Sequence, residues 1–304
     1  MKPLMSESYQ KFLSTLIVTI GAFLGFEALA YSIGLYQLRQ SLYLSFYIYA
    51  FHIFWLTFIF DLHLKNRGVL AAVWIEGWDL KIIWKALLQR FDYMFNWHHF
   101  RHFQNYLVLP GLLYWSAVTL LFLNPFNFGL KQALVLFTTI AMGVTYWFMK
   151  EHISRRLEAI DWWIRILSIA KLFAAFLVYS ALIGITFHFG YDATFLLLAV
   201  STVTFLLIYQ ALFQHNLLNF SILLWIVIAS LVMAIVSLWV YSNWNTQYFT
   251  AGVVMLAVYN SLWGILHHYL DGTLTRKIVF EYLVMMILVV SVLFASHNFN
   301  QRIV

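Results

Sequence analysis

The stretch "HHFRH" at 98–102 concentrates histidine in a way that could support chemistry. His98 and His102 are four residues apart, and His99 and His102 are three apart, so either pair can lie on one face of a helix. Two imidazoles on one helix face can begin a metal site. Because the chain has no cysteine, nitrogen and oxygen ligands would have to hold the metal, and these suit zinc or non-haem iron.

A second stretch, "HHYLDG" at 267–272, adds a carboxylate to a pair of histidines. His267 lies four residues and His268 three residues before Asp271. Such a set can hold a metal, or it can act as a base with its orienting carboxylate without one. The candidate catalytic residues are therefore His267, His268 and Asp271. The candidate ligands of an iron or zinc ion are His98, His99, His102, His215 and His267.

The composition indicates what kind of scaffold must position these residues. Hydrophobic residues make up 63% of the 304 residues and charged residues only 10%, and the mean hydropathy is +0.81. A water-soluble domain needs more charge on its surface, so we expect an integral membrane protein. Apolar stretches of about 20 residues predict an all-α, polytopic bundle of about nine transmembrane helices. The expected spans are Phe12–Tyr36, Ser41–Phe60, Tyr106–Leu123, Leu130–Met149, Trp162–Phe187, Ala193–Phe213, Leu217–Tyr241, Phe249–Tyr269 and Ile278–Ser296.

Lysine and arginine are distributed unequally between the two sides of this bundle. Most lie in the N-terminal segment, in 61–105 and 150–165, and at 276–277. The opposite side has only Arg39, Lys131 and Arg302. By the positive-inside rule the first side is cytoplasmic. We therefore expect a multi-pass protein of a bacterial inner membrane, with a cytoplasmic N-terminus and a periplasmic C-terminus.

Two further features refine this topology. The longest polar stretch, 62–105, keeps Trp84, Leu88, Phe91 and Phe95 at helical spacing, which predicts an amphipathic helix in the cytoplasmic interface. No repeat or linker divides the chain, so 1–304 is expected to form a single integral membrane domain. An Ala-x-Ala pattern that ends at Ala30 leaves cleavage of the first span as an alternative.

This topology places most of the 11 histidines on the cytoplasmic face. They are His63, His98, His99, His102, His152, His215, His267 and His268. The one-sided distribution suggests a common metal or catalytic site. The competing explanation is that interfacial histidines hold their polar tips among the lipid headgroups and have no further role.

Ionisable residues inside the predicted spans suggest a different function. Glu27, His52, Lys171 and Glu281 lie within spans, where a lone charge costs about 3 kcal/mol or more unless it is paired. A path lined by these residues would belong to a transporter or channel. A structural pair between Glu27 and His52 is the alternative.

The segment 267–277, "HHYLDGTLTRK", resembles the H-x-x-x-D-G-x-x-W-[KR] segment of a group of bacterial polytopic membrane proteins with no assigned function. The matching residues are His267, Asp271, Gly272 and Arg276. Thr275 stands where that group has tryptophan. "YQALFQHNLLNF" is similar to the upstream histidine-containing helix of the same group, with His215 in the matching place.

Two larger families show partial similarity. Membrane-bound fatty-acid desaturases and hydroxylases are similar in their cytoplasm-facing histidine boxes, although "HHFRH" reverses their H-x-x-H-H and the remaining boxes are missing. Membrane-bound O-acyltransferases resemble "FNWHHFRHFQNYLVLP" and "NSLWGILHHY", although the spacing differs and no tryptophan-histidine-glycine motif occurs. These resemblances imply either metal-dependent lipid modification or metal-free acyl transfer.

The function expected from the sequence is an inner-membrane enzyme that acts on a lipid or other hydrophobic substrate at the histidine-rich, cytoplasm-facing site. It would be a non-haem metal-dependent lipid-modifying enzyme or a metal-free acyl or group transferase. Membrane lipids are the expected partners, and the net charge of +6 is expected to anchor loops on anionic lipid rather than to bind nucleic acid. A transporter or channel and a scaffold subunit of a membrane complex are the alternatives.

Overall fold

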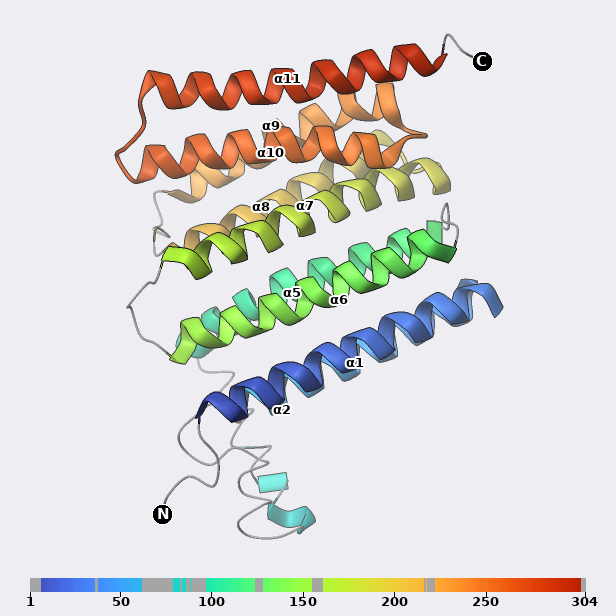
Figure 1. The fold of residues 1–304 in the computed structure, drawn as a ribbon, viewed down its shortest axis with the longest axis vertical. Helices are drawn as coiled ribbons and strands as arrows, with labels where there is room; N and C mark the ends of the chain where they lie inside the picture. The colour runs from blue at the N-terminus through green and yellow to red at the C-terminus, as the bar shows by residue number, and fades with distance from the viewer. Residues whose placement is uncertain are drawn as a thin grey trace. The chain divides into compact units, whose positions relative to one another are not determined.

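The part of the chain that the structure describes is almost entirely helical (Figure 1). The computed structural model describes residues 7–35, 38–61, 79–82, 84–85, 88, 97–123, 128–154, 161–215, 217 and 222–301. Its long helices are α1 (Glu7–Leu35), α2 (Leu38–Asp61), α5 (Trp97–Leu123), α6 (Phe128–Ser154), α7 (Asp161–Phe189), α8 (Ala193–Gln214), α9 (Leu223–Trp244), α10 (Tyr248–Leu270) and α11 (Arg276–Gln301). These ranges contain no strand, which confirms the predicted all-α class.

Seven of the described helices are long and apolar enough to cross a membrane. They are α1, α6, α7, α8, α9, α10 and α11. This finding confirms a polytopic helical membrane protein. Crossings through α2 and α5 stay predictions, because α2 is not among these seven helices and the apolar part of α5, Leu107–Leu123, is shorter than the others.

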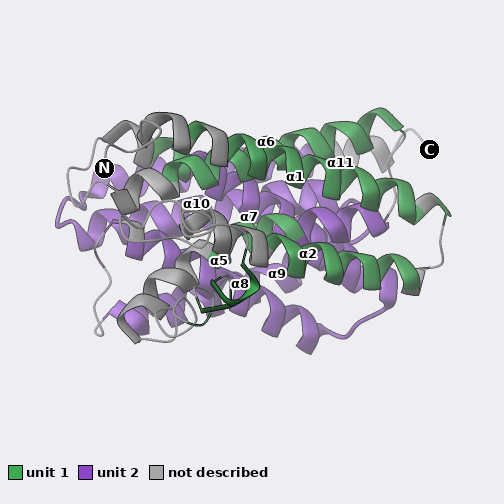
Figure 2. Ribbon diagram, turned by 90° about the horizontal axis from the view of Figure 1, so that it is seen from below, with its two compact units in different colours: residues 1–114, 125–167 green, residues 115–124, 168–304 purple. Residues whose placement is uncertain are grey.

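Contacts divide the chain into two compact units (Figure 2). Unit 1 contains residues 1–114 and 125–167, and unit 2 contains residues 115–124 and 168–304. In unit 1, α1 packs against α2 and α6. In unit 2, α8 packs against α9, while α10 contacts α8, α9 and α11. Each unit therefore buries its own set of helix faces, and the single domain expected over 1–304 stays a prediction.

Unit 1 holds two of the ionisable residues that suggest a transport path. His52 lines a largely apolar cavity of about 270 Å³, and its Nε2 has no hydrogen-bond partner among the described residues. Glu27 accepts a hydrogen bond of 3.2 Å from Nε2 of Gln132 on α6. The expected pair between Glu27 and His52 is therefore wrong, because α6 supplies the partner of Glu27 instead.

Unit 2 is held together by small residues and by buried polar contacts. The Tyr179 hydroxyl on α7 lies 2.9 Å from the Thr204 hydroxyl on α8. Where α10 meets α11, a Cβ atom on Gly264 would overlap the ring of Tyr282 and would lie 2.6 Å from its hydroxyl oxygen. Glycine at this position therefore permits the close approach of α10 and α11.

The interfacial helix predicted over 62–105 lies largely outside the described residues. Of its apolar stripe, Trp84 and Leu88 are described, and both side chains are exposed. The part from Trp97 onward belongs to α5.

Candidate functional site

The candidate site lies at the end of unit 2 where α8 and α10 end and α11 begins. His215 is the residue that caps the C-terminus of α8. Its backbone N–H donates to the Ala211 carbonyl at 3.2 Å, and the Leu217 N–H donates to the Leu212 carbonyl at 3.0 Å. These two bonds close the last turn of α8 and fix the position of the His215 backbone.

The turn after α10 positions Asp271 relative to His267. The Gly272 N–H donates to the Tyr269 carbonyl at 3.2 Å, and the Thr273 N–H donates to the His268 carbonyl at 3.0 Å. This pattern is a Schellman motif, which requires a left-handed residue, and Gly272 has φ of 68°. The motif keeps Asp271 one helical turn after His267, so the sequence "HHYLDG" dictates their approach.

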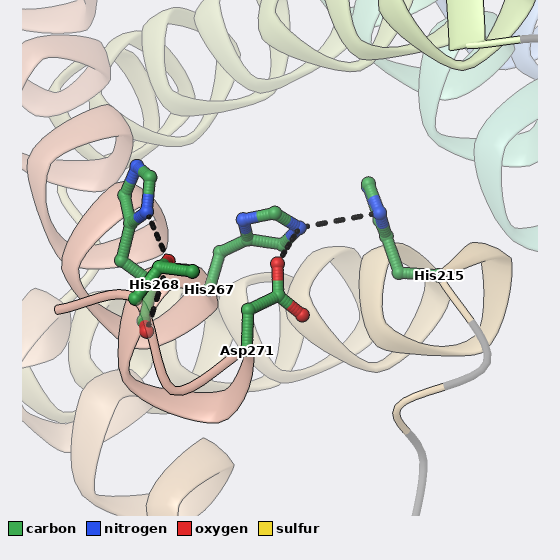
Figure 3. A network of polar contacts seen from close by, with 5 residues as sticks. His215, His267, His268 and Asp271 are labelled. Atoms are coloured by element: carbon green, nitrogen blue, oxygen red, sulfur yellow. Dashed lines mark hydrogen bonds and ion pairs between the residues drawn. The ribbon is translucent and has the colours of Figure 1, made fainter.

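Two polar side chains, those of His215 and Asp271, converge on Nε2 of His267 (Figure 3). Nε2 lies 3.2 Å from Nδ1 of His215 and 3.4 Å from Oδ2 of Asp271. The two imidazole rings meet edge to face, with centroids 4.5 Å apart. The side chains of His267 and Asp271 are 24% and 36% exposed, so the cluster is partly accessible.

The polar contacts favour one tautomer for each histidine. A carboxylate oxygen attracts an N–H group and repels a ring lone pair, so the proximity of Asp271 favours neutral His267 with its proton on Nε2. His215 Nδ1 then faces an N–H group and must accept, which puts the proton of His215 on its own Nε2. His267 Nδ1 is left with a free lone pair, and it has no hydrogen-bond partner among the described residues.

His268, the third candidate catalytic residue, turns toward a different partner. Its Nδ1 lies 2.8 Å from the hydroxyl of Thr273, a residue of the Schellman turn. The rings of His267 and His268 are 5.8 Å apart, centroid to centroid. His268 therefore stabilises the turn, while His267 and Asp271 form the polar contact.

An aromatic ring connects this cluster to a buried lysine. The Trp263 ring lies one turn before His267 on α10, with centroids 5.4 Å from His267 and 5.8 Å from His215. The Lys171 Nζ lies 5.6 Å from the centroid of the same ring. Lys171 is only 3% exposed, and its Nζ has no hydrogen-bond partner in the part of the chain that the structure describes.

Burial controls the charge of His215. Burial, followed by the charges of Lys171 and His267, lowers the pKa of His215 from its usual 6.5 to about 4. His215 is therefore neutral at physiological pH, as its acceptor role toward His267 requires.

Two of the five predicted metal ligands, His215 and His267, belong to this site. His215 and His267 are brought together, but the side chains of His98, His99 and His102 lie outside the described residues. Within the described ranges, no group of three or more histidine, aspartate or glutamate side chains has the arrangement of a metal site. The iron or zinc site thus stays a prediction that depends on the stretch 98–102.

Three residues of the site were not among the site candidates from sequence. Trp263 precedes His267 by four residues, and this helical spacing was a usable signal. The sequence marked Lys171 as a charged residue within a predicted span. Its contact with Trp263 could not be predicted, because it depends on how side chains of α7 and α10 pack. Thr273 is the third addition, as the partner of His268.

Comparison with known proteins identifies a family. Residues 85–296 match the family described as "Protein of unknown function (DUF5656)". This segment is more than half of the chain, and it contains His215, His267 and Asp271 as well as Lys171 and Trp263. No curated protein and no solved structure matches the chain. The chain therefore belongs to the DUF5656 family.

Proposed function

We propose that the chain is a membrane enzyme that acts on a lipid or other hydrophobic substrate, with His267 as general base and Asp271 as its orienting carboxylate. The observation that carries the proposal is the position of His267 Nε2 between Asp271 Oδ2 and His215 Nδ1. A base needs a second group that fixes its tautomer and stabilises its protonated form, and in this proposal Asp271 supplies both effects.

In this proposal His267 Nδ1 takes a proton from a substrate hydroxyl or from water. Asp271, 3.4 Å from Nε2, then stabilises the imidazolium that forms. His215 stays neutral because burial keeps its pKa low, so it accepts from His267 without repelling the imidazolium. The oxygen that loses its proton attacks the ester carbonyl of an acyl donor, and the imidazolium returns the proton to the alcohol oxygen that leaves this carbonyl, so that one ester bond forms as another breaks.

The surroundings of the site favour a hydrophobic substrate. Helices α8, α10 and α11, which bound the site, are all apolar enough to cross a membrane. The side chains of Phe280 and Met285 on α11 are 68% and 64% exposed, which suits contact with lipid chains. The unequal distribution of lysine and arginine supports an orientation in which this end faces the cytoplasm of a bacterial inner membrane.

Two of the four residues of the transporter alternative, Glu27 and Glu281, have local partners instead of a shared path. Glu281 lies 3.9 Å from Lys277 on the same helix, and both side chains are well exposed. Glu27 is bonded to Gln132. These contacts give Glu27 and Glu281 structural roles, so the enzyme is favoured.

The test is conversion of lipid by the purified protein in bilayers that contain phosphatidylethanolamine, phosphatidylglycerol and free fatty acid. Mass spectrometry of the lipids would follow substrate loss and product formation for the wild type, His267→Ala and Asp271→Asn. His188→Ala is the matched control, because His188 is an exposed histidine in the last turn of α7 and makes no contact with His267 or Asp271 in the described part of the chain. We expect conversion that persists in His188→Ala and falls at least about 100-fold in His267→Ala. Conversion that survives in His267→Ala would contradict the proposal.

A further inference from the structure

The geometry points to Lys171 as the binding group for an acidic part of the substrate, a phosphate or a carboxylate, held beside Trp263 and His215. This inference rests on the proposed function, because it names the class of substrate that His267 would act on. Its starting point is the isolation of a buried ammonium group next to the candidate base.

Lys171 has no anionic partner in the described part of the molecule. Its side chain is 3% exposed, and its Nζ has neither a hydrogen bond nor an ion pair there. Asp271, the carboxylate of this cluster, is engaged by His267 Nε2. An unpaired ammonium away from water is costly, and the attraction to the Trp263 ring offsets only part of that cost.

The site offers a second donor to an acidic group. The tautomers fixed by Asp271 place the remaining proton of His215 on Nε2, on the side of the ring that does not contact His267. Trp263 packs against both His215 and His267 and also lies under the Lys171 Nζ. The ammonium and the imidazole N–H therefore flank one aromatic ring, a set that suits the oxygens of a phosphate or carboxylate.

The depth of Lys171 favours an acidic lipid as the source of these oxygens. Lys171 lies six residues after Arg165, where the apolar part of α7 begins, which is about 9 Å along the helix axis. A lysine at this depth extends toward the headgroup region, while its stem packs among apolar residues. An acidic lipid has an apolar chain that suits the membrane interior and an acidic headgroup that suits Lys171. Bound in this way, its headgroup would lie close to His267.

The experiment compares thermal unfolding and retained lipid for the wild type and Lys171→Met in phosphatidylcholine bilayers. Phosphatidic acid, oleic acid or inorganic phosphate is added in separate arms, and native mass spectrometry measures the retained lipid. Lys277→Met is the matched control, because that lysine is 85% exposed. Since methionine fills an apolar site without a buried charge, we expect Lys171→Met to fold. Lys171→Arg is the second variant, which keeps the charge and is expected to keep the lipid.

We expect an acidic lipid to raise the unfolding temperature of the wild type and of Lys277→Met, but not that of Lys171→Met. The amount of acidic lipid retained should be at least about 30-fold lower in Lys171→Met than in the wild type. Removing one partner of a buried charge pair weakens binding by this much. Stabilisation of the wild type by inorganic phosphate alone, abolished in Lys171→Met, would support the same site with a free anion as its ligand. Equal retention by the wild type and Lys171→Met, or an equal loss in Lys277→Met, would overturn the inference.

Binding and turnover separate the two proposals. Asp271→Asn should retain the acidic lipid while its conversion falls. If Lys171→Met loses the lipid but Asp271→Asn and His267→Ala convert lipid normally, the anion site stands and the general base is wrong. If Lys171→Met keeps the lipid while His267→Ala loses conversion, the base stands and the anion site is wrong.

Discussion

Replacing Asp271 with asparagine removes the charge that would stabilise protonated His267 while it keeps the shape of the side chain. The Nε2–Oδ2 distance of 3.4 Å corresponds to about 5 kcal/mol of attraction at an effective dielectric constant near 20, and to about 1 kcal/mol in water. The two side chains are 24% and 36% exposed, so screening by solvent favours the lower half of this range. A loss of about 1 to 3 kcal/mol corresponds to a fall in rate of about 5- to 160-fold.

The assay is kcat/KM for lipid conversion in bilayers, measured for the wild type, Asp271→Asn and Thr273→Val. Thr273 is in the same turn but contacts His268 rather than His267, so Thr273→Val should stay within about threefold of the wild type. Asp271→Asn at the wild-type rate would refute the orienting role of the carboxylate. An equal loss in Thr273→Val would assign the effect to the turn instead.

Three further outcomes follow from the geometry and can be checked by unfolding measurements. Gly264→Ala should destabilise unit 2 by about 1 to 2 kcal/mol because its Cβ would overlap the Tyr282 ring. Gly21→Ala, where a Cβ meets nothing within 4 Å, should be neutral or slightly stabilising, so equal losses would contradict the packing argument. Gly272→Ala should cost about 1 to 2 kcal/mol because φ there is 68°, and no loss would speak against the Schellman turn. The free energy of unfolding should not depend on His215 above pH 6.5, and it should fall as the pH is lowered from 6.5 to about 4. The reason is that the unfolded chain binds a proton at His215 in this range, whereas burial keeps the folded His215 neutral. His215→Gln should make this dependence on pH less steep.

Much of the fold could be predicted from the sequence because the signal is local. Every predicted span overlaps a described helix, since apolar stretches long enough to cross a bilayer admit little other regular structure. The pair of His267 and Asp271 was also predictable, because four residues separate them on a helix that ends in "DG".

The rest of the site depends on contacts between helices, which could not be predicted from residue spacing within one helix. His215 joins His267 only because α8 and α10 end at the same end of unit 2. The approach of Lys171 to Trp263 requires side chains of two helices to meet across unit 2. The same limit explains the wrong pair between Glu27 and His52, because Gln132 from α6 supplies the partner.

The most direct test of the central claim is ¹⁵N NMR of histidine-labelled protein in bilayers near neutral pH, with His267→Gln used to assign the signal. The account predicts a neutral His267 ring with its proton on Nε2 and an unprotonated Nδ1, and a change in this signal in Asp271→Asn. A proton on Nδ1, or a signal that does not respond to Asp271→Asn, would contradict the claim that Asp271 holds His267 as the base.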